Sequence, residues 1–164
     1  MSLPGVEQAR VEGSFRDPSG YVFSREGRIF RALDEACFQA LNPLLTGEAW
    51  SQMAQHGWFV PTQIVNDPIV DTLKKEHPGY NHFLEHDRLP FITYPYEWTF
   101  SMLADAALLT LDIQRQLLES GLSLKDGTAY NVQFPAGKPV FIDISSIYKN
   151  HWMMRYNHFL GAFV

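Results

Sequence analysis

This 164-residue chain has little cysteine, no excess of basic residues and few long apolar runs. The single cysteine, Cys37, excludes an internal disulfide framework and is typical of a reducing compartment. Thirteen basic residues against 18 acidic ones give a net charge of −5, without the basic stripe of most nucleic-acid-binding domains. No N-terminal stretch joins a basic flank to an apolar run, so we expect no signal peptide.

The longest helical apolar pattern, residues 100–118, is interrupted by Asp105, Asp112 and Arg115, which argues against a membrane span. Apolar residues make up 46% of the chain and charged residues 19%, as in globular domains. The length suits one domain with a sizeable core. We therefore expect a soluble, cytoplasmic protein with neither membrane nor nucleic-acid partners.

Apolar spacing and turn residues predict a mixed α+β chain. Residues 1–19 show no sustained periodicity and are predicted to form an arm. Strand-like segments are expected at 21–24 and 28–31, which form a hairpin around Arg25-Glu26-Gly27. Further strand-like segments are expected at 58–61, 63–65, 80–84 and 91–94, with a second hairpin formed by 132–134 and 139–142. Helices are expected over 30–41 (ended by Asn42-Pro43), 46–57 (capped by Thr46), 69–76, 99–119 (buried on more than one face) and 148–164.

Three polar residues surround the predicted hairpin. Asp126 and Asn131 lie five positions apart in the loop before it, and Asp143 closes it. A phosphoryl-transfer site needs one carboxylate to orient a hydroxyl, and an amide and a second carboxylate as oxygen ligands for Mg²⁺. The spacing is therefore typical of a site in which Asp126 is the catalytic base and Asn131 and Asp143 hold the metal.

This pattern resembles the catalytic loop and metal-binding Asp of the protein-kinase-like fold, and of aminoglycoside phosphotransferases in particular. A closer resemblance, from about Gly20 onward, is to the N-terminal region of nodulation-related bacterial proteins described as SAM-dependent methyltransferases. The shared segments are 89–98 (Leu-Pro-Phe-Ile-Thr-Tyr-Pro-Tyr-Glu-Trp), 105–112 (Asp-Ala-Ala-Leu-Leu-Thr-Leu-Asp) and 124–131 (Leu-Lys-Asp-Gly-Thr-Ala-Tyr-Asn).

The resemblance implies a divergent, truncated, two-lobe kinase-like fold. Residues 20–95 would form a small α/β lobe and 96–164 a helical lobe carrying the catalytic-type loop, while the methyltransferase domain would follow as a partner outside this chain. Tyr94, Tyr96 and Trp98, at the linker between the lobes, would line the cleft for ATP. Lys125 would contact a phosphate.

Several kinase features are absent. The first 73 residues contain no lysine, so the strand lysine that holds phosphates in kinases has no counterpart. Arg31 or Arg28, paired with Glu48, would replace it. The alternative is that each arginine lies on the surface of a hairpin. No Gly-x-Gly-x-x-Gly loop is present, Leu124-Lys125 replaces the usual His-Arg or His-Gly, and Asp-Ile-Ser at 143–145 replaces Asp-Phe-Gly. These departures predict weakened nucleotide handling.

Three functional hypotheses follow. The first is a pseudokinase-like accessory or ligand-recognition domain that binds Mg²⁺ with ATP or a phosphorylated small molecule. The second is an active small-molecule phosphotransferase. The third is a protein-interaction module in which Asp126 caps a turn, Asn131 ties the loop to its own backbone and Asp143 ends a strand.

One further motif, His82-Phe-Leu-Glu85-His86, matches the inverted zinc-protease pattern. That chemistry requires both histidines on one face of a helix. Pro78-Gly79 and Pro90 bracket a segment that is predicted to be a strand, so we expect no zinc site here.

Overall fold

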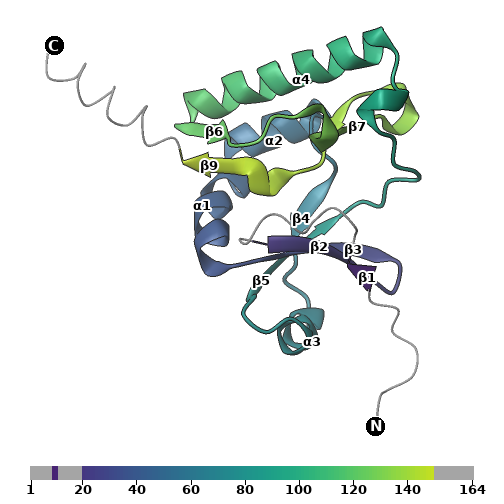
Figure 1. Cartoon of the computed structure of the whole chain (residues 1–164). Coiled ribbons are helices and arrows are strands. Elements are labelled where there is room, and N and C mark those ends of the chain that lie inside the picture. Colours follow the sequence, from purple (N-terminus) through teal and green to yellow (C-terminus); the bar gives the residue numbers. More distant parts are fainter. Residues whose placement is uncertain (1–8, 11–19, 150–164) are drawn as a thin grey trace, which may run out of the picture. The chain divides into compact units, whose positions relative to one another are not determined.

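The computed structural model describes residues 9–10 and 20–149. They form two compact units, the first within Met1–Asn42 and Val60–Pro90 and the second within Pro43–Phe59 and Phe91–Val164. Both helices and strands are present, which confirms the α+β class (Figure 1). Residues 43–59, which the sequence assigned to the small lobe, group with the second unit because the Trp58 carbonyl accepts the Phe141 N–H at 2.8 Å.

The first unit is built on an antiparallel sheet in the order β1-β2-β3-β5-β4. Its strands are β1 (Ala9–Arg10), β2 (Gly20–Arg25), β3 (Arg28–Leu33), β4 (Thr62–Ile64) and β5 (His82–His86). Glu26 and Gly27, both at positive φ, form the tight turn that joins β2 to β3, as the sequence predicted. This two-residue turn matches the twist of the paired strands.

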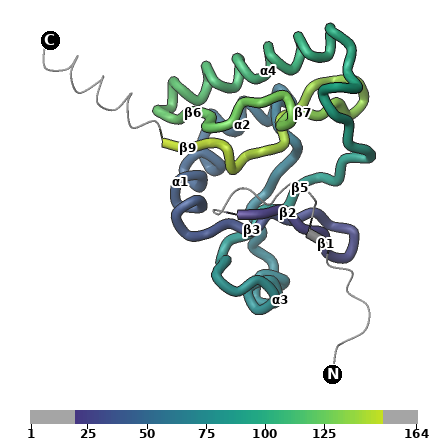
Figure 2. Tube along the Cα trace, viewed as in Figure 1, coloured from purple at the N-terminus to yellow at the C-terminus, as the bar shows by residue number. Residues whose placement is uncertain are grey.

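One face of this sheet carries the core of the first unit. Alternating strand residues place aromatic side chains, among them Phe23, Phe30 and Phe83, on the same face. Helix α3 (Ile69–Glu76) lies against this sheet (Figure 2). Its Leu73 side chain is fully buried in the aromatic cluster. The predicted helix over 69–76 is therefore confirmed.

Helix α1 (Glu35–Leu45) begins after Asp34, whose Oδ1 accepts the Cys37 N–H at 2.7 Å. The predicted helix over 30–41 was wrong at both ends, because residues 30–33 belong to β3 and the helix continues through Pro43. An internal proline costs a helix about 3 kcal/mol. Burial of Leu44 beyond it offsets that cost.

Within residues 43–59 and 91–149, the described part of the second unit, helices α2 (Glu48–Gln55) and α4 (Phe100–Glu119) accompany two short antiparallel strand pairs. Helix α2 starts after Gly47 rather than at a Thr46 cap, and α4 starts after Thr99, whose Oγ1 accepts the Met102 N–H. Strand β6 (Leu122–Leu124) pairs with β9 (Ile147–Lys149), and β7 (Val132–Gln133) pairs with β8 (Val140–Phe141), which confirms the predicted hairpin.

Two other expectations for this unit were wrong, and a third was wrong at its first two residues. Helix α4 buries only one face and leaves large apolar side chains exposed on the other. Residues 91–94 form no strand, because their backbone is held by a side chain described below and they lead into the 3-10 turn η1 (Pro95–Glu97). Residues 148–149 lie in β9, and the rest of the predicted terminal helix, 150–164, lies outside the described residues.

Among the residues that the structure describes, no helix is both long and apolar enough to cross a membrane.

Candidate functional site

The loop between β6 and β7 closes on itself through Asp126 and Asn131. The Asn131 side-chain N–H donates to the Asp126 carbonyl at 2.9 Å, and the Asp126 Oδ1 accepts the Thr128 N–H at 3.2 Å. Asn131 ends the 3-10 turn η2 (Ala129–Asn131), and Asp126 is exposed. No described residue donates a hydrogen bond to the Asn131 Oδ1, so this oxygen can accept a metal ion or a proton donor.

Asp143 is brought to the same loop by the β7–β8 hairpin. The Asn131 carbonyl accepts the N–H of Ile142, the residue before Asp143, at 2.8 Å. The Asp143 Oδ1 accepts the Ser145 hydroxyl at 2.7 Å, and its carbonyl accepts the Ser146 N–H and hydroxyl. Asp143 thereby precedes the 3-10 turn η4 (Ile144–Ser146).

The backbone of Lys125 is fixed opposite this turn, since its N–H donates to the Ser146 carbonyl at 2.8 Å. Lys125, Asp126, Asn131 and Asp143 thus belong to one hydrogen-bonded loop system. This loop system carries carboxylate, amide and ammonium groups, which are the chemical types that bind Mg²⁺ and phosphate.

Two contacts with α4 position this loop. The Gln114 side chain receives the Leu124 N–H at 3.0 Å and donates to the Ser123 Oγ at 2.9 Å, which joins the helix to β6 (Figure 1). A Cβ at Gly127 would lie 3.1 Å from the Thr110 Cγ2. A side chain at this position would require the Thr110 methyl group to shift by a few tenths of an ångström, so glycine suits the close approach of the loop to the helix.

A buried glutamine connects the hairpin to the segment before α4. The Gln133 Oε1 accepts the Thr93 N–H at 2.9 Å, and its Nε2 donates to the Thr93 carbonyl at 2.9 Å. Gln133 is only 3% exposed. The Thr93 hydroxyl accepts the Trp98 Nε1–H at 2.9 Å, and the buried Trp98 ring packs edge-on against Phe134. Trp98 is thus placed in the core of the second unit.

Tyr94 and Tyr96, the other two linker candidates, are exposed at the surface. Their rings stack with centroids 5.5 Å apart and an angle of 6° between the planes. Partial desolvation, followed by the charges of Glu97, Tyr94 and Tyr130, raises the pKa of Tyr96. The exposed and stacked rings of Tyr94 and Tyr96 offer an aromatic surface in the segment before α4.

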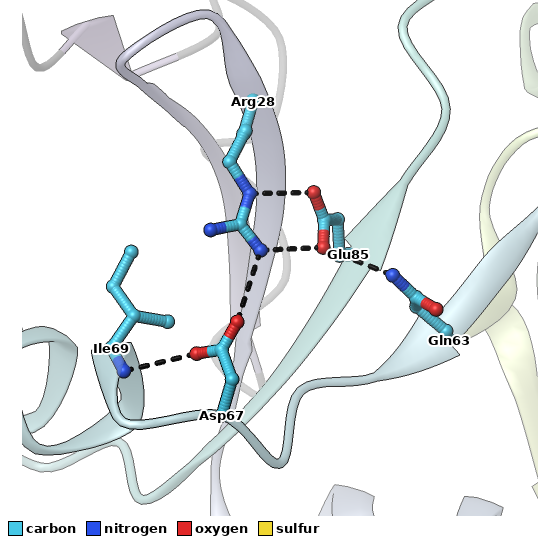
Figure 3. A network of polar contacts seen from close by, with 5 residues as sticks. All are labelled: Arg28, Gln63, Asp67, Ile69 and Glu85. Carbon is cyan, nitrogen blue, oxygen red and sulfur yellow. Dashed lines mark hydrogen bonds and ion pairs between the residues drawn. The ribbon is translucent and has the colours of Figure 1, made fainter.

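The arginine candidates lie in β3 of the first unit. Arg31 is buried, at 6% exposure. Arg28 is held by Glu85 through two bonds of 2.7 Å and by Asp67 at 3.4 Å (Figure 3). The hydrogen bonds from Arg28 lower the pKa of Glu85, and Gln63 adds a further bond. Arg28 is therefore part of a structural network that joins β3, β5 and the loop before α3 (Figure 3).

Glu48, the expected partner of Arg31, lies in the first turn of α2 in the second unit, where its Oε1 accepts the Gln52 side-chain N–H at 3.3 Å.

The His82-Glu85-His86 motif lies on strand β5, as the sequence predicted, and not on a helix. His82 bonds to Glu35 at 2.7 Å and stacks on Phe38 of α1. Glu85 points to the opposite face of the strand, where it binds Arg28. No cluster of three or more His, Cys, Asp or Glu suited to a metal occurs among the described residues.

His86 is a buried neutral histidine. The Thr62 hydroxyl donates its hydrogen to the Val60 carbonyl at 2.7 Å, so the 2.8 Å contact with Thr62 is donated by the His86 Nδ1–H. The unprotonated Nε2 is buried. Desolvation and then the nearby Arg31 charge lower the pKa of His86 to about 3.

The sequence missed the residues that position the candidate loop, namely Gln114, Gln133 and Thr93. Gln133 lies between Val132 and Phe134 in an apolar segment, where an amide must find partners once it is buried. That position was the available signal for Gln133, although it did not reveal the partners. Gln114 lies among polar residues of α4 and gave no such signal.

This α+β chain is similar in sequence to a curated protein. The sequence matches no protein-family model. It is 42% identical over 138 residues to the Nodulation protein NoeA of Rhizobium meliloti (strain 1021). The matched region covers 84% of this chain and 28% of NoeA, so the chain spans less than a third of its relative's length. The predicted relation to nodulation proteins is confirmed.

Proposed function

We propose that this chain is a divergent kinase-like module that binds Mg²⁺ with ATP or a phosphorylated small molecule through Asp126, Asn131 and Asp143. The order of elements supports this proposal: an antiparallel sheet whose strands are separated by α1, α2 and α3, then a long helix, a polar loop and a hairpin ending in an aspartate. Fold likeness alone does not fix an activity, so the proposal depends on the loop.

The observation that carries the proposal is the bond from the Asn131 side chain to the Asp126 carbonyl. It orients the amide so that Nδ2 faces the loop and Oδ1 is left for a ligand. The backbone bond from the Ile142 N–H to the Asn131 carbonyl places the residue that precedes Asp143 beside Asn131. An amide oxygen and a carboxylate on adjacent elements are ligands that Mg²⁺ accepts together with phosphate oxygens.

We favour ligand binding over phosphate transfer because the Asp126 carboxylate already receives the Thr128 N–H. A catalytic base has to accept a substrate proton, and this bond already occupies one oxygen of the carboxylate. The Asp-Ile-Ser sequence after β8 also makes a local turn, since Ser145 donates to the Asp143 carboxylate. An active phosphotransferase with Asp126 as base is therefore the second candidate.

A thermal-shift titration with Mg²⁺ and ATP tests the proposal. Nucleotide at 100 times its Kd adds about 2.7 kcal/mol to the free energy of unfolding. For a chain of this size this corresponds to a rise in Tm of about 5–10 °C. Asp143→Asn should abolish the rise, whereas Asp112→Asn, a carboxylate change on the outer side of α4, should retain it. No rise at millimolar Mg·ATP in the wild type would refute the nucleotide proposal.

An interaction module is the third candidate, and the exposed apolar residues of the second unit favour it. Phe91 and Ile92 are more than half exposed just before the linker tyrosines. Because NoeA is more than three times as long as the matched region, we propose the remainder of a longer protein, of methyltransferase type, as the partner. Binding of such a domain without any nucleotide-induced shift would favour this candidate.

A further inference from the structure

Helix α4 presents an apolar stripe on its outer side. The side chains of Phe100, Leu108 and Leu111 are 87%, 60% and 65% exposed. Ala104 and Ala107 lie between them in the helix. Spacings of three or four positions place these residues on one face. We call these five residues the outer stripe.

The side of α4 opposite the outer stripe is buried. It consists of Ala106, Leu109, Ile113 and Leu117, which pack into the second unit. A helix at a protein surface normally carries polar residues on the side away from its core. Exposed apolar side chains in that place are typical of a surface that binds another molecule.

A row of acidic residues runs beside the outer stripe. Asp105, Asp112 and Glu119 are spaced by seven residues, or two helical turns, so they lie along one flank of the stripe. Asp105 and Glu119 are exposed, and the Asp112 side chain is 50% exposed. We call these three residues the acidic row. Their carboxylates are accessible to a molecule bound on the stripe.

The outer stripe and the acidic row together match the pattern of one helix of a coiled coil. In that pattern, apolar residues at two positions of each heptad form the seam, and charged residues beside the seam select the partner. Ala104, Leu108 and Leu111 occupy seam positions, and the acidic row occupies the position after the second of them. The other flank of the seam, which holds Phe100 and Ala107, carries no charge. The face therefore suits a partner helix with basic residues on one flank.

We propose that the outer side of α4 is a docking surface for an amphipathic helix of a different protein. The apolar face of that helix packs on the outer stripe, and its Lys or Arg residues face the acidic row. Opposite charges at the edge of the contact fix its orientation and register. This docking surface is independent of any ligand at the candidate loop.

A second copy of the chain is the weaker occupant of the outer stripe. In an antiparallel pair of α4 helices, the two acidic rows would meet each other. In a parallel pair, each acidic row would meet the uncharged flank that holds Phe100 and Ala107. Neither arrangement supplies a basic partner for the carboxylates. An anionic membrane surface would repel them as well.

Calorimetric titration of the full chain with two synthetic peptides tests the proposal. Both peptides carry Leu at the seam positions over about three heptads, with Lys at the flanking positions of one and Glu at those of the other. The Lys peptide should bind at least about 10-fold more tightly, and this ratio should fall as salt is raised. Leu108→Ser/Leu111→Ser should weaken its binding at least about 10-fold. Phe91→Ser/Ile92→Ser, which changes two exposed apolar residues outside α4, should retain it.

Charge reversal distinguishes docking on α4 from a general attraction to an acidic protein. Asp105→Lys/Asp112→Lys should reverse the preference, so that the Glu peptide binds more tightly than the Lys peptide. Asp71→Lys/Asp87→Lys makes the same change in net charge at exposed positions of the first unit, and it should keep the preference for the Lys peptide. Binding gained by the Glu peptide requires a folded variant, so this result does not depend on a loss of stability.

A single cysteine reports the position of the bound peptide. In a Cys37→Ser background, Ala107→Cys should react with a maleimide at the rate of a free thiol, and a saturating amount of the Lys peptide should slow the reaction at least about 10-fold. Slow labelling of the monomer without peptide would show that the chain itself covers the stripe, and would overturn the proposal.

Three other results would also overturn it. The first is no binding of the Lys peptide up to about 100 μM. The second is equal affinity for the two peptides. The third is a dimer in light scattering that Leu108→Ser/Leu111→Ser dissociates, which would assign the stripe to a second copy of the chain.

Discussion

Replacing Gln133 by alanine should destabilise the second unit more than any surface substitution. The side chain makes two bonds of 2.9 Å with the backbone of Thr93, and it is buried between the hairpin and the segment before α4. Alanine leaves the Thr93 N–H and carbonyl without these partners. The effect is local to the segment 91–98 and the β7–β8 hairpin.

The magnitude follows from the two bonds. Each contributes about 1 kcal/mol net, and a buried backbone group left without a partner costs about 1–3 kcal/mol more. Thr93 is only half-buried, so water partly replaces the lost bonds. We therefore expect a loss of about 3 kcal/mol in the free energy of unfolding, or about 6–12 °C in Tm for a chain of this size.

Urea denaturation followed by tryptophan fluorescence measures the change, with Gln39→Ala as the control. Gln39 is an exposed glutamine on α1 whose amide bonds only to Glu35 across one helical turn, so its replacement should cost less than about 0.5 kcal/mol. Gln133→Glu adds a sharper comparison, because a carboxylate accepts the Thr93 N–H but cannot donate to the Thr93 carbonyl. Equal stabilities of Gln133→Ala and Gln39→Ala would refute the reasoning.

Three further predictions concern buried or paired polar groups. Glu85→Gln should lower the free energy of unfolding by about 1 kcal/mol near neutral pH. Because Arg28 lowers the Glu85 pKa, the difference in stability between wild type and variant should disappear as pH falls below about 4.3, as measured by urea titration. His86 has a pKa of about 3 in the folded protein, so below about pH 6.5 the unfolded chain binds a proton that the folded chain does not. The free energy of unfolding should therefore fall by about 1.4 kcal/mol per pH unit, and His86→Gln should reduce this pH dependence. An unchanged slope would contradict the burial of neutral His86. Trp98→Phe should lose the bond to Thr93 and about 1 kcal/mol by calorimetry, and an unchanged Tm would show that this bond contributes nothing.

Elements with a complete local signal were predictable from the sequence. Helix α3 has breakers at both ends and an amphipathic middle, and the turn at Glu26-Gly27 lies between two alternating runs. The β7–β8 hairpin was likewise visible as two apolar runs around Pro135. Each of these patterns depends on neighbours within a few positions.

The errors came from contacts between distant residues. The sequence suggested a strand at 91–94, but there Thr93 is held by the Gln133 side chain, 40 residues away. It suggested a helix end before Pro43, but burial of Leu44 extends the helix. The candidate residues Asp126, Asn131 and Asp143 were named from spacing, whereas the bond from Asn131 to the Asp126 carbonyl required the folded loop.

The most direct test of metal binding by the candidate loop is a titration with Mn²⁺, monitored by electron paramagnetic resonance. Mn²⁺ favours the same oxygen ligands as Mg²⁺. In the presence of ATP and the wild-type chain, the signal of unbound Mn²⁺ should fall further than with ATP alone. Asp143→Asn and Asn131→Leu should each abolish this additional loss, and Asp112→Asn should retain it. Identical signals with and without the wild-type chain would contradict a metal–nucleotide site.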